Sequence, residues 1–172
     1  MNLLRASDLR IRRRVQPFLK RRQTLPVDVF GIARGQGADV RRVDLAPDVA
    51  GILYREPDRT VMVVNALLSD VRQRLSIARQ LGHLVLHGRR AVTVDAGFRV
   101  DVGSPTSGAL DQIEDVEANL FALHLLCPSD RMSAVFKGPM VDFADQADLD
   151  AKAARFGVPS GLLVLRLLTM AD

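Results

Sequence analysis

Two histidines four residues apart, His83 and His87, stand in the part of the sequence best suited to chemistry. A zinc hydrolase built on a helix needs two histidines at this spacing, because both imidazoles then reach one ion from the same face. It also needs a glutamate directly after the first histidine, to take a proton from the zinc-bound water. At the corresponding positions before His83, this chain carries Arg79 and Gln80.

Both residues are chemically unsuited to those roles. A guanidinium stays protonated at physiological pH, has no lone pair to donate and repels a divalent cation. The amide of Gln80 is not a base, and loss of a general base alone slows a reaction by a factor of about 100 to 10,000. The motif therefore predicts a site that has lost hydrolytic chemistry.

The surrounding segment resembles the active-site helix of the ImmA/IrrE metallopeptidases. Residues 72–87 follow that family's pattern R-x-R-F-T-x-A-H-E-L-G-H-x-x-L-H, with R-Q-L-G-H in place of H-E-L-G-H. Four other parts of the chain match the family in order: residues 26–33, Asn65, residues 117–128 of the third-ligand helix and residues 154–158. The resemblance covers about residues 25–168 and implies a zincin-like metallopeptidase core.

The same resemblance places the third metal ligand on the later helix. The E-x-x-A pattern puts it at Asp115, with Glu114 and Glu117 as alternatives. Arg79, His83 and Asp115 are therefore expected to be vestigial metal-site positions, with Gln80 at the general-base position. We expect Arg79 to form an ion pair with Asp115 that replaces the metal and ties the two helices together.

A displaced metal site is the alternative. His83 and His87 could bind zinc with an acid from residues 114–117, although Gln80 would then lie on the wrong side to help. Zinc is expected only if such a site functions. His124, on the third-ligand helix, is expected to be a partly buried packing residue, and Cys127 a small buried hydrophobic residue.

The pattern of the elements predicts an α+β fold. A small three-stranded antiparallel sheet is expected to pack on the active-site helix and the third-ligand helix, followed by C-terminal helices. A helix with a break at Pro17 and a second helix with Pro26 in its first turn are expected to precede the sheet. The expected strands are 39–45, 51–54 and 60–65, with a possible edge strand at 91–94, and the expected later helices are 69–87, 111–126, 145–156 and 159–169.

Length and composition predict one domain over residues 1–172. It comprises a basic N-terminal segment (1–24), a peptidase-like core (25–128) and a C-terminal helical segment (129–172). The first 22 residues hold eight basic side chains against one acid, so they could bind nucleic acid by releasing counterions. The basic residues concerned are Arg10, Arg12, Arg13, Arg14, Lys20, Arg21 and Arg22. One cysteine and no long apolar run predict a cytoplasmic protein without a membrane partner.

Three functions follow as hypotheses. The first is a catalytically inactive ImmA/IrrE-like module that binds a helix-turn-helix repressor or similar regulator, as the resemblance implies, and senses DNA. The second is an active metal-dependent endopeptidase that cleaves a repressor through a non-standard site. The third is a nucleic-acid-binding protein that uses the basic N-terminal segment.

Overall fold

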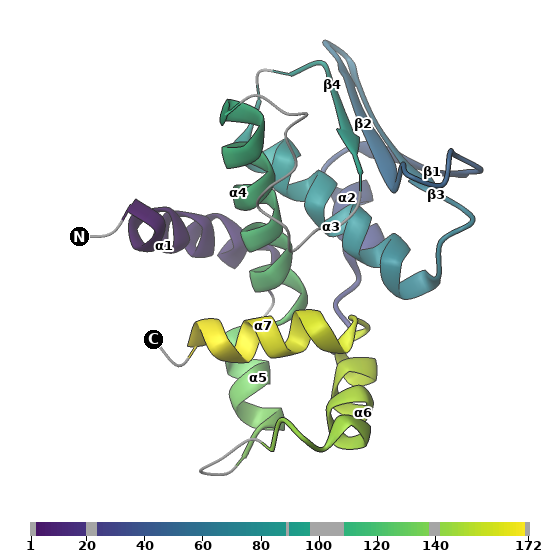
Figure 1. Ribbon diagram of the computed structural model, residues 1–172. Coiled ribbons are helices and arrows are strands. Elements are labelled where there is room, and N and C mark those ends of the chain that lie inside the picture. Colours follow the sequence, from purple (N-terminus) through teal and green to yellow (C-terminus); the bar gives the residue numbers. More distant parts are fainter. Residues whose placement is uncertain (1–2, 20–23, 89, 97–108, 138–141, 171–172) are drawn as a thin grey trace.

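The computed structural model describes residues 3–19, 24–88, 90–96, 109–137 and 142–170. A sheet packs on helix α3, helix α4 packs against α3, and three C-terminal helices lie at the end of α4 (Figure 1). The helices are α1 (Leu3–Val15), α2 (Val29–Gly35), α3 (Asp70–Leu86), α4 (Ala109–Leu126), α5 (Ser129–Val135), α6 (Gln146–Phe156) and α7 (Ser160–Met170), with a short 3-10 turn, η1 (Gln16–Phe18). The strands are β1 (Ala38–Val43), β2 (Gly51–Glu56), β3 (Arg59–Asn65) and β4 (Val92–Asp95).

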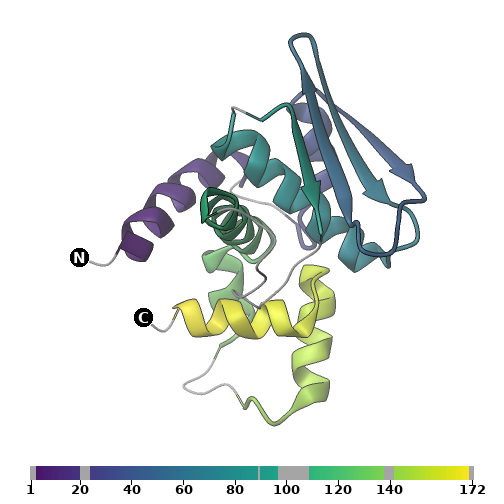
Figure 2. The ribbon, with the colours of Figure 1, turned by 45° about the horizontal axis from the view of Figure 1, so that its top comes forward.

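The α+β fold is confirmed, but the sheet differs from the predicted one. It has four strands in the order β1-β3-β2-β4, and β1 pairs with β3 in parallel. Strand β2 is antiparallel to both β3 and β4. Figure 2 shows the four strands side by side over α3. The expectation of three antiparallel strands was wrong because the chain between β1 and β2 crosses to the far side of β3.

Asn65, at the end of β3, holds that crossing segment in place. Its side-chain amide donates to the carbonyl oxygens of Ala46 and Val49, at 3.2 and 2.9 Å. Its side-chain oxygen accepts from the backbone N–H groups of Leu45 and Leu67. A buried side chain that satisfies this many backbone groups fixes the path of a loop that has no secondary structure of its own.

One helix starts later than expected, and one helix was not expected. Helix α2 begins at Val29, and Asp28 caps it by accepting from the N–H of Gly31, so Pro26 precedes the helix instead of standing in its first turn. Helix α5 directly follows Pro128 and was not predicted, because its seven residues are too short for a clear helical period. The predicted break at Pro17 is present, since α1 ends in η1 there.

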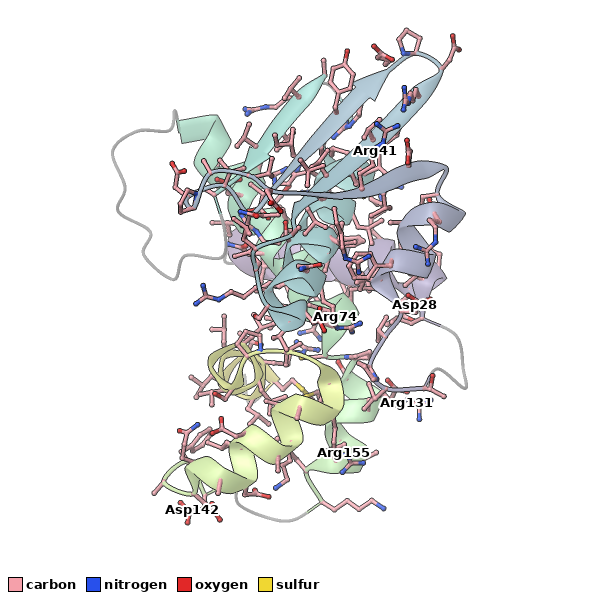
Figure 3. All side chains as sticks on the ribbon, turned by 90° about the vertical axis from the view of Figure 1, so that its right-hand side faces the viewer. Asp28, Arg41, Arg74, Arg131, Asp142 and Arg155 are labelled. Atoms are coloured by element: carbon pink, nitrogen blue, oxygen red, sulfur yellow. The ribbon has the colours of Figure 1, made fainter. Side chains whose placement is uncertain are left out.

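Arg74, on α3, joins the sheet-bearing part to the C-terminal helices (Figure 3). Its guanidinium donates to the carbonyl oxygen of Val27, ahead of α2, and to that of Gly157, at the end of α6. Gly157 has a positive φ of 64°, which favours glycine at a helix end.

Among the described helices none is long and apolar enough by itself to cross a membrane, and only the α6–α7 pair, bent by 91°, passes that test.

Candidate functional site

The candidate site lies where α3 and α4 pack closely together. A Cβ atom on Gly82 would stand 3.0 Å from the Cα of Ala118, so glycine is the residue that lets α4 approach at this point. Arg79, Gln80 and His83, on the same stretch of α3, are all buried, at 4%, 0% and 2% exposure. Close packing thus encloses three polar side chains, each of which needs a partner.

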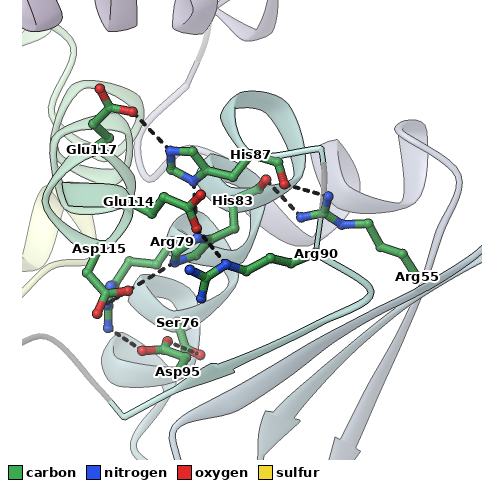
Figure 4. Close-up of polar contacts among 10 residues, drawn as sticks. All are labelled: Arg55, Ser76, Arg79, His83, His87, Arg90, Asp95, Glu114, Asp115 and Glu117. Atoms are coloured by element: carbon green, nitrogen blue, oxygen red, sulfur yellow. Dashed lines mark hydrogen bonds and ion pairs between the residues drawn. The ribbon is translucent and has the colours of Figure 1, made fainter. Parts of the chain in front are cut away.

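Arg79 is neutralised mainly by a carboxylate on the sheet. It forms an ion pair with Asp95, the last residue of β4, whose side chain is 2% exposed (Figure 4). The other carboxylate oxygen of Asp95 accepts from the hydroxyl of Ser76, at 2.8 Å. Asp115, the partner expected from the sequence, lies farther off, with 4.0 Å between its Oδ1 and Nη2 of Arg79. The guanidinium therefore ties α3 to β4 more closely than it ties α3 to α4.

Gln80 points its amide nitrogen toward the sheet. The nitrogen donates to the carbonyl oxygen of Val63, at 3.0 Å, and lies 3.3 Å from the hydroxyl of Ser76. The amide oxygen is buried and has no hydrogen-bond partner among the described residues. A glutamate here would place a carboxylate oxygen next to the Val63 carbonyl oxygen. Both groups are acceptors, so no hydrogen bond could form between them.

Gly51 makes room for this amide, which leads to a first prediction. A Cβ atom at Gly51 would lie 2.2 Å from Nε2 of Gln80 and 2.6 Å from the Val63 carbonyl oxygen. We expect Gly51→Ala to lower the free energy of unfolding by about 1–3 kcal/mol, as overpacked positions do. Urea unfolding measures this. Gly161→Ala is the matched control, because nothing lies within 4 Å of its Cβ position, and an equal loss in both variants would contradict the prediction.

Two histidines and two acids form a chain of contacts across the helix pair. Nδ1 of His87 lies 3.2 Å from Nδ1 of His83, and its Nε2 lies 3.0 Å from a carboxylate oxygen of Glu117. Nε2 of His83 lies 3.5 Å from Oδ1 of Asp115. Arg55, from β2, donates to the backbone carbonyl oxygens of both histidines and so caps the end of α3. The ring nitrogens of the two histidines are therefore held by each other and by the two acids, and their backbone carbonyl oxygens are held by Arg55.

Burial is the main cause that lowers the pKa of His83 to about 3. Neighbouring positive charges act in the same direction; they belong to His87, Arg79, Arg55 and Arg90. Burial likewise lowers the pKa of His124 to about 4. Both rings are neutral near pH 7, so His83 has a lone pair but sits in a field that opposes any further cation.

These shifts predict a loss of stability in acid. The unfolded chain binds a proton on each histidine near pH 6.5, whereas the folded chain does so only near pH 3 for His83 and pH 4 for His124. The free energy of unfolding should therefore fall as pH drops from about 6.5, by up to about 1.4 kcal/mol per pH unit for each group. His83→Gln should remove about half of that steepness between pH 6 and 4. Urea unfolding at stepped pH values measures it, and an unchanged steepness would refute the assignment to His83.

The residues that the resemblance places at the family's metal positions do not fit zinc. A catalytic zinc ion needs three protein donors around an open position. Here His83 and Asp115 supply two, and the third position holds the guanidinium of Arg79, which donates protons instead of electrons. No hydrolytic step can be derived through a metal bound at these three positions.

A displaced donor set does exist beside them. One ligand atom from each of His83, His87 and Glu114 lies within 4.8 Å of the other two. Glu114 is paired with Arg90, at 2.9 Å, and Arg90 also contributes to the positive field on His83. A metal here would have to displace that guanidinium and enter a region that already carries three arginines.

The other sequence-predicted residues lie apart from this cluster or at its edge. Arg10 pairs with Glu117, and Arg12 pairs with Asp8 at 2.7 Å. Arg13 and Arg14 are exposed in the last turn of α1. Lys20, Arg21 and Arg22 lie outside the described residues. His124 and Cys127 are buried, and Nε2 of His124 lies 2.6 Å from a carboxylate oxygen of Asp8.

Sequence reasoning missed three contributors: Asp95, Arg55 and Arg90. Asp95 ends a short strand in a stretch interpreted mainly as a loop, 16 residues after Arg79. The alternating Val92-Thr93-Val94 pattern before it was the available signal for a strand that ends at the site. Nothing in the spacing of Arg55 and Arg90 shows that they face the end of α3.

Comparison with known proteins identifies the scaffold. A family model described as the IrrE N-terminal-like domain, peptidase M78, matches residues 33–168. A solved structure of a Mycobacterium tuberculosis transcriptional regulator superposes with a TM-score of 0.57 at 22% sequence identity. That match covers 94% of this chain and 46% of the other, so this chain spans less than half the length of that protein. No curated protein matches the chain. The match over most of its residues shows that the chain belongs to the IrrE N-terminal-like family of the M78 peptidases.

Proposed function

We propose that this protein is a non-catalytic member of its family that acts as a regulatory binding module on a transcription regulator. The observation that carries the proposal is the buried ion pair between Arg79 and Asp95, at the position where a metal ligand is expected. A fixed cation there satisfies the nearby carboxylates without a metal ion, so the scaffold keeps its shape while hydrolysis is lost.

Gln80 supports the same conclusion independently. Its amide nitrogen is engaged by the Val63 carbonyl, so the side chain serves the packing of α3 on the sheet. An amide in this position has no proton-accepting role toward water. Two separate steps of metallopeptidase chemistry, water activation and metal binding, therefore lack their residues.

The proposed partner is a helix-turn-helix repressor or a similar regulator. The resemblance to ImmA/IrrE proteins implies such a partner, and the similar solved structure is that of a transcriptional regulator, which fits a role in regulation. An inactive module would act on that partner by occupancy, since binding alone can block or stabilise a repressor.

Pull-down of a co-expressed helix-turn-helix repressor with the tagged protein tests this proposal. We expect a complex in which mass spectrometry finds the repressor at full length. A shortened repressor, with the truncation prevented by EDTA, would overturn it in favour of an active endopeptidase. If the experiment shows no complex and no cleavage, both functions are contradicted for that partner.

The active endopeptidase remains a second candidate, favoured by the donor set of His83, His87 and Glu114. This function requires zinc bound through His87, a residue that is not among the three metal positions expected from the family. His87→Gln should then abolish both metal binding and cleavage, whereas under the first proposal neither is present in the wild-type protein.

A further inference from the structure

A cavity of about 350 Å³ lies between α1, the segment before α2, α5 and α7. Its volume is at the lower end of the range for small-molecule sites, about 300–1,000 Å³. Aliphatic side chains and a proline form the apolar part of its wall: Val15, Leu19, Leu25, Val27 and Pro128. Polar and charged side chains form the rest: Arg12, Gln16, His124, Ser129, Asp130, Arg131 and Arg166, with Asp130 paired to Arg131 at 3.5 Å. It shares no residue with the cluster around Arg79, so it is a separate feature of the fold.

Arg166, from α7, lines this cavity and is 1% exposed. Its Nε donates to the carbonyl oxygen of Cys127, at 3.0 Å, and its Nη2 to the hydroxyl of Ser129, at 2.6 Å. Both partners are neutral. The remaining nitrogen, Nη1, is buried and has no hydrogen-bond partner among the residues that the structure describes.

The charge of this guanidinium also lacks a direct counter-charge. No carboxylate of the described residues lies within ion-pair distance, 4.0 Å, of Arg166. Asp8 acts on it only from farther away and is itself held by Arg12 and His124. Buried charges in proteins are paired, because an uncompensated one is strongly unfavourable. An anion in the cavity would supply the counter-charge that this guanidinium lacks.

We propose that this cavity binds a carboxylate with a short aliphatic body. The carboxylate pairs with the guanidinium of Arg166, which lines the cavity, and the aliphatic body packs against Leu19, Leu25 and Val27. A bare inorganic anion would leave that apolar wall uncovered, whereas an uncharged hydrocarbon would leave the guanidinium unpaired. This binding function goes beyond the proposed regulatory role and does not depend on it.

Isothermal titration calorimetry with hexanoate tests the proposal on the full chain. We expect saturable binding, and at least about tenfold weaker binding of the uncharged isostere hexanamide, because hydrogen bonds between charged partners are the stronger ones. Acetate should also bind at least about tenfold more weakly, since it lacks the aliphatic body. N-acetyl-leucine distinguishes the two possible sources of the carboxylate. If it binds more tightly than hexanoate, the ligand is the carboxyl terminus of a peptide; if it binds more weakly, the ligand is a free acid.

Two variants locate the site. Leu19→Trp fills the cavity and leaves Arg166 in place, while Arg166→Gln removes the charge; each should weaken hexanoate binding at least about tenfold. Leu9→Trp is the matched control, because Leu9 is exposed elsewhere on α1 and should leave binding unchanged. Absence of hexanoate binding, equal binding of hexanamide, or unchanged binding in Leu19→Trp would each overturn the proposal.

Discussion

Replacement of Arg79 by methionine is expected to lower the free energy of unfolding by about 3–5 kcal/mol, the usual effect of breaking a buried ion pair from one side. Methionine matches the length of the arginine stem but removes the charge. Asp95, with 2% of its side chain exposed, would then lose the counter-charge that Arg79 supplies and keep its contact with the Ser76 hydroxyl. Urea unfolding at neutral pH measures the loss.

A double variant separates the charge from the packing. In Arg79→Met with Asp95→Asn, the amide still accepts from Ser76 but no longer carries a charge, so most of the lost stability should return. Lys152→Met is the matched control. It breaks the ion pair with Asp148, whose side chain is 44% exposed, and should change stability by no more than about 1 kcal/mol. A loss for Arg79→Met no larger than that for Lys152→Met would contradict a structural role for the buried pair.

Replacement of Arg79 by histidine is expected to create a zinc site where the wild-type chain has none. The change removes the opposing cation and adds a third donor to His83 and Asp115. Asp95 is then available to accept from the new imidazole, which is a common arrangement behind zinc-bound histidines. Zinc at a hundredfold excess over its dissociation constant should stabilise this variant by about 2.7 kcal/mol.

Thermal unfolding with and without zinc measures this stabilisation. His83→Gln combined with Arg79→His is the control, because it removes one of the three zinc ligands. Adding Gln80→Glu restores the base but should lower stability in the absence of zinc, since the carboxylate faces the Val63 carbonyl. If Arg79→His gains no zinc-dependent stability, Arg79 is not what excludes the metal.

Local pattern in the sequence predicted the helices of the site and several of its residues. The period of α3 and α4 and the family motifs led to Arg79, Gln80, His83 and Asp115, and the structure brings Arg79, His83 and Asp115 together. The principal partner of Arg79 was missed, because Asp95 reaches it through the pairing of β4 with β2. Such long-range pairing depends on the path of the loops, which local sequence patterns do not show. For the same reason the direction of β1 relative to β3 was predicted wrongly.

Zinc content of the purified wild-type chain, measured by inductively coupled plasma mass spectrometry after growth with added zinc, tests the central claim most directly. Because we propose that Arg79 takes the place of a metal ligand, we predict less than about one-tenth of a zinc ion per chain after gel filtration. About one zinc ion per chain, lost in His83→Gln, would contradict the claim that an arginine has replaced the metal.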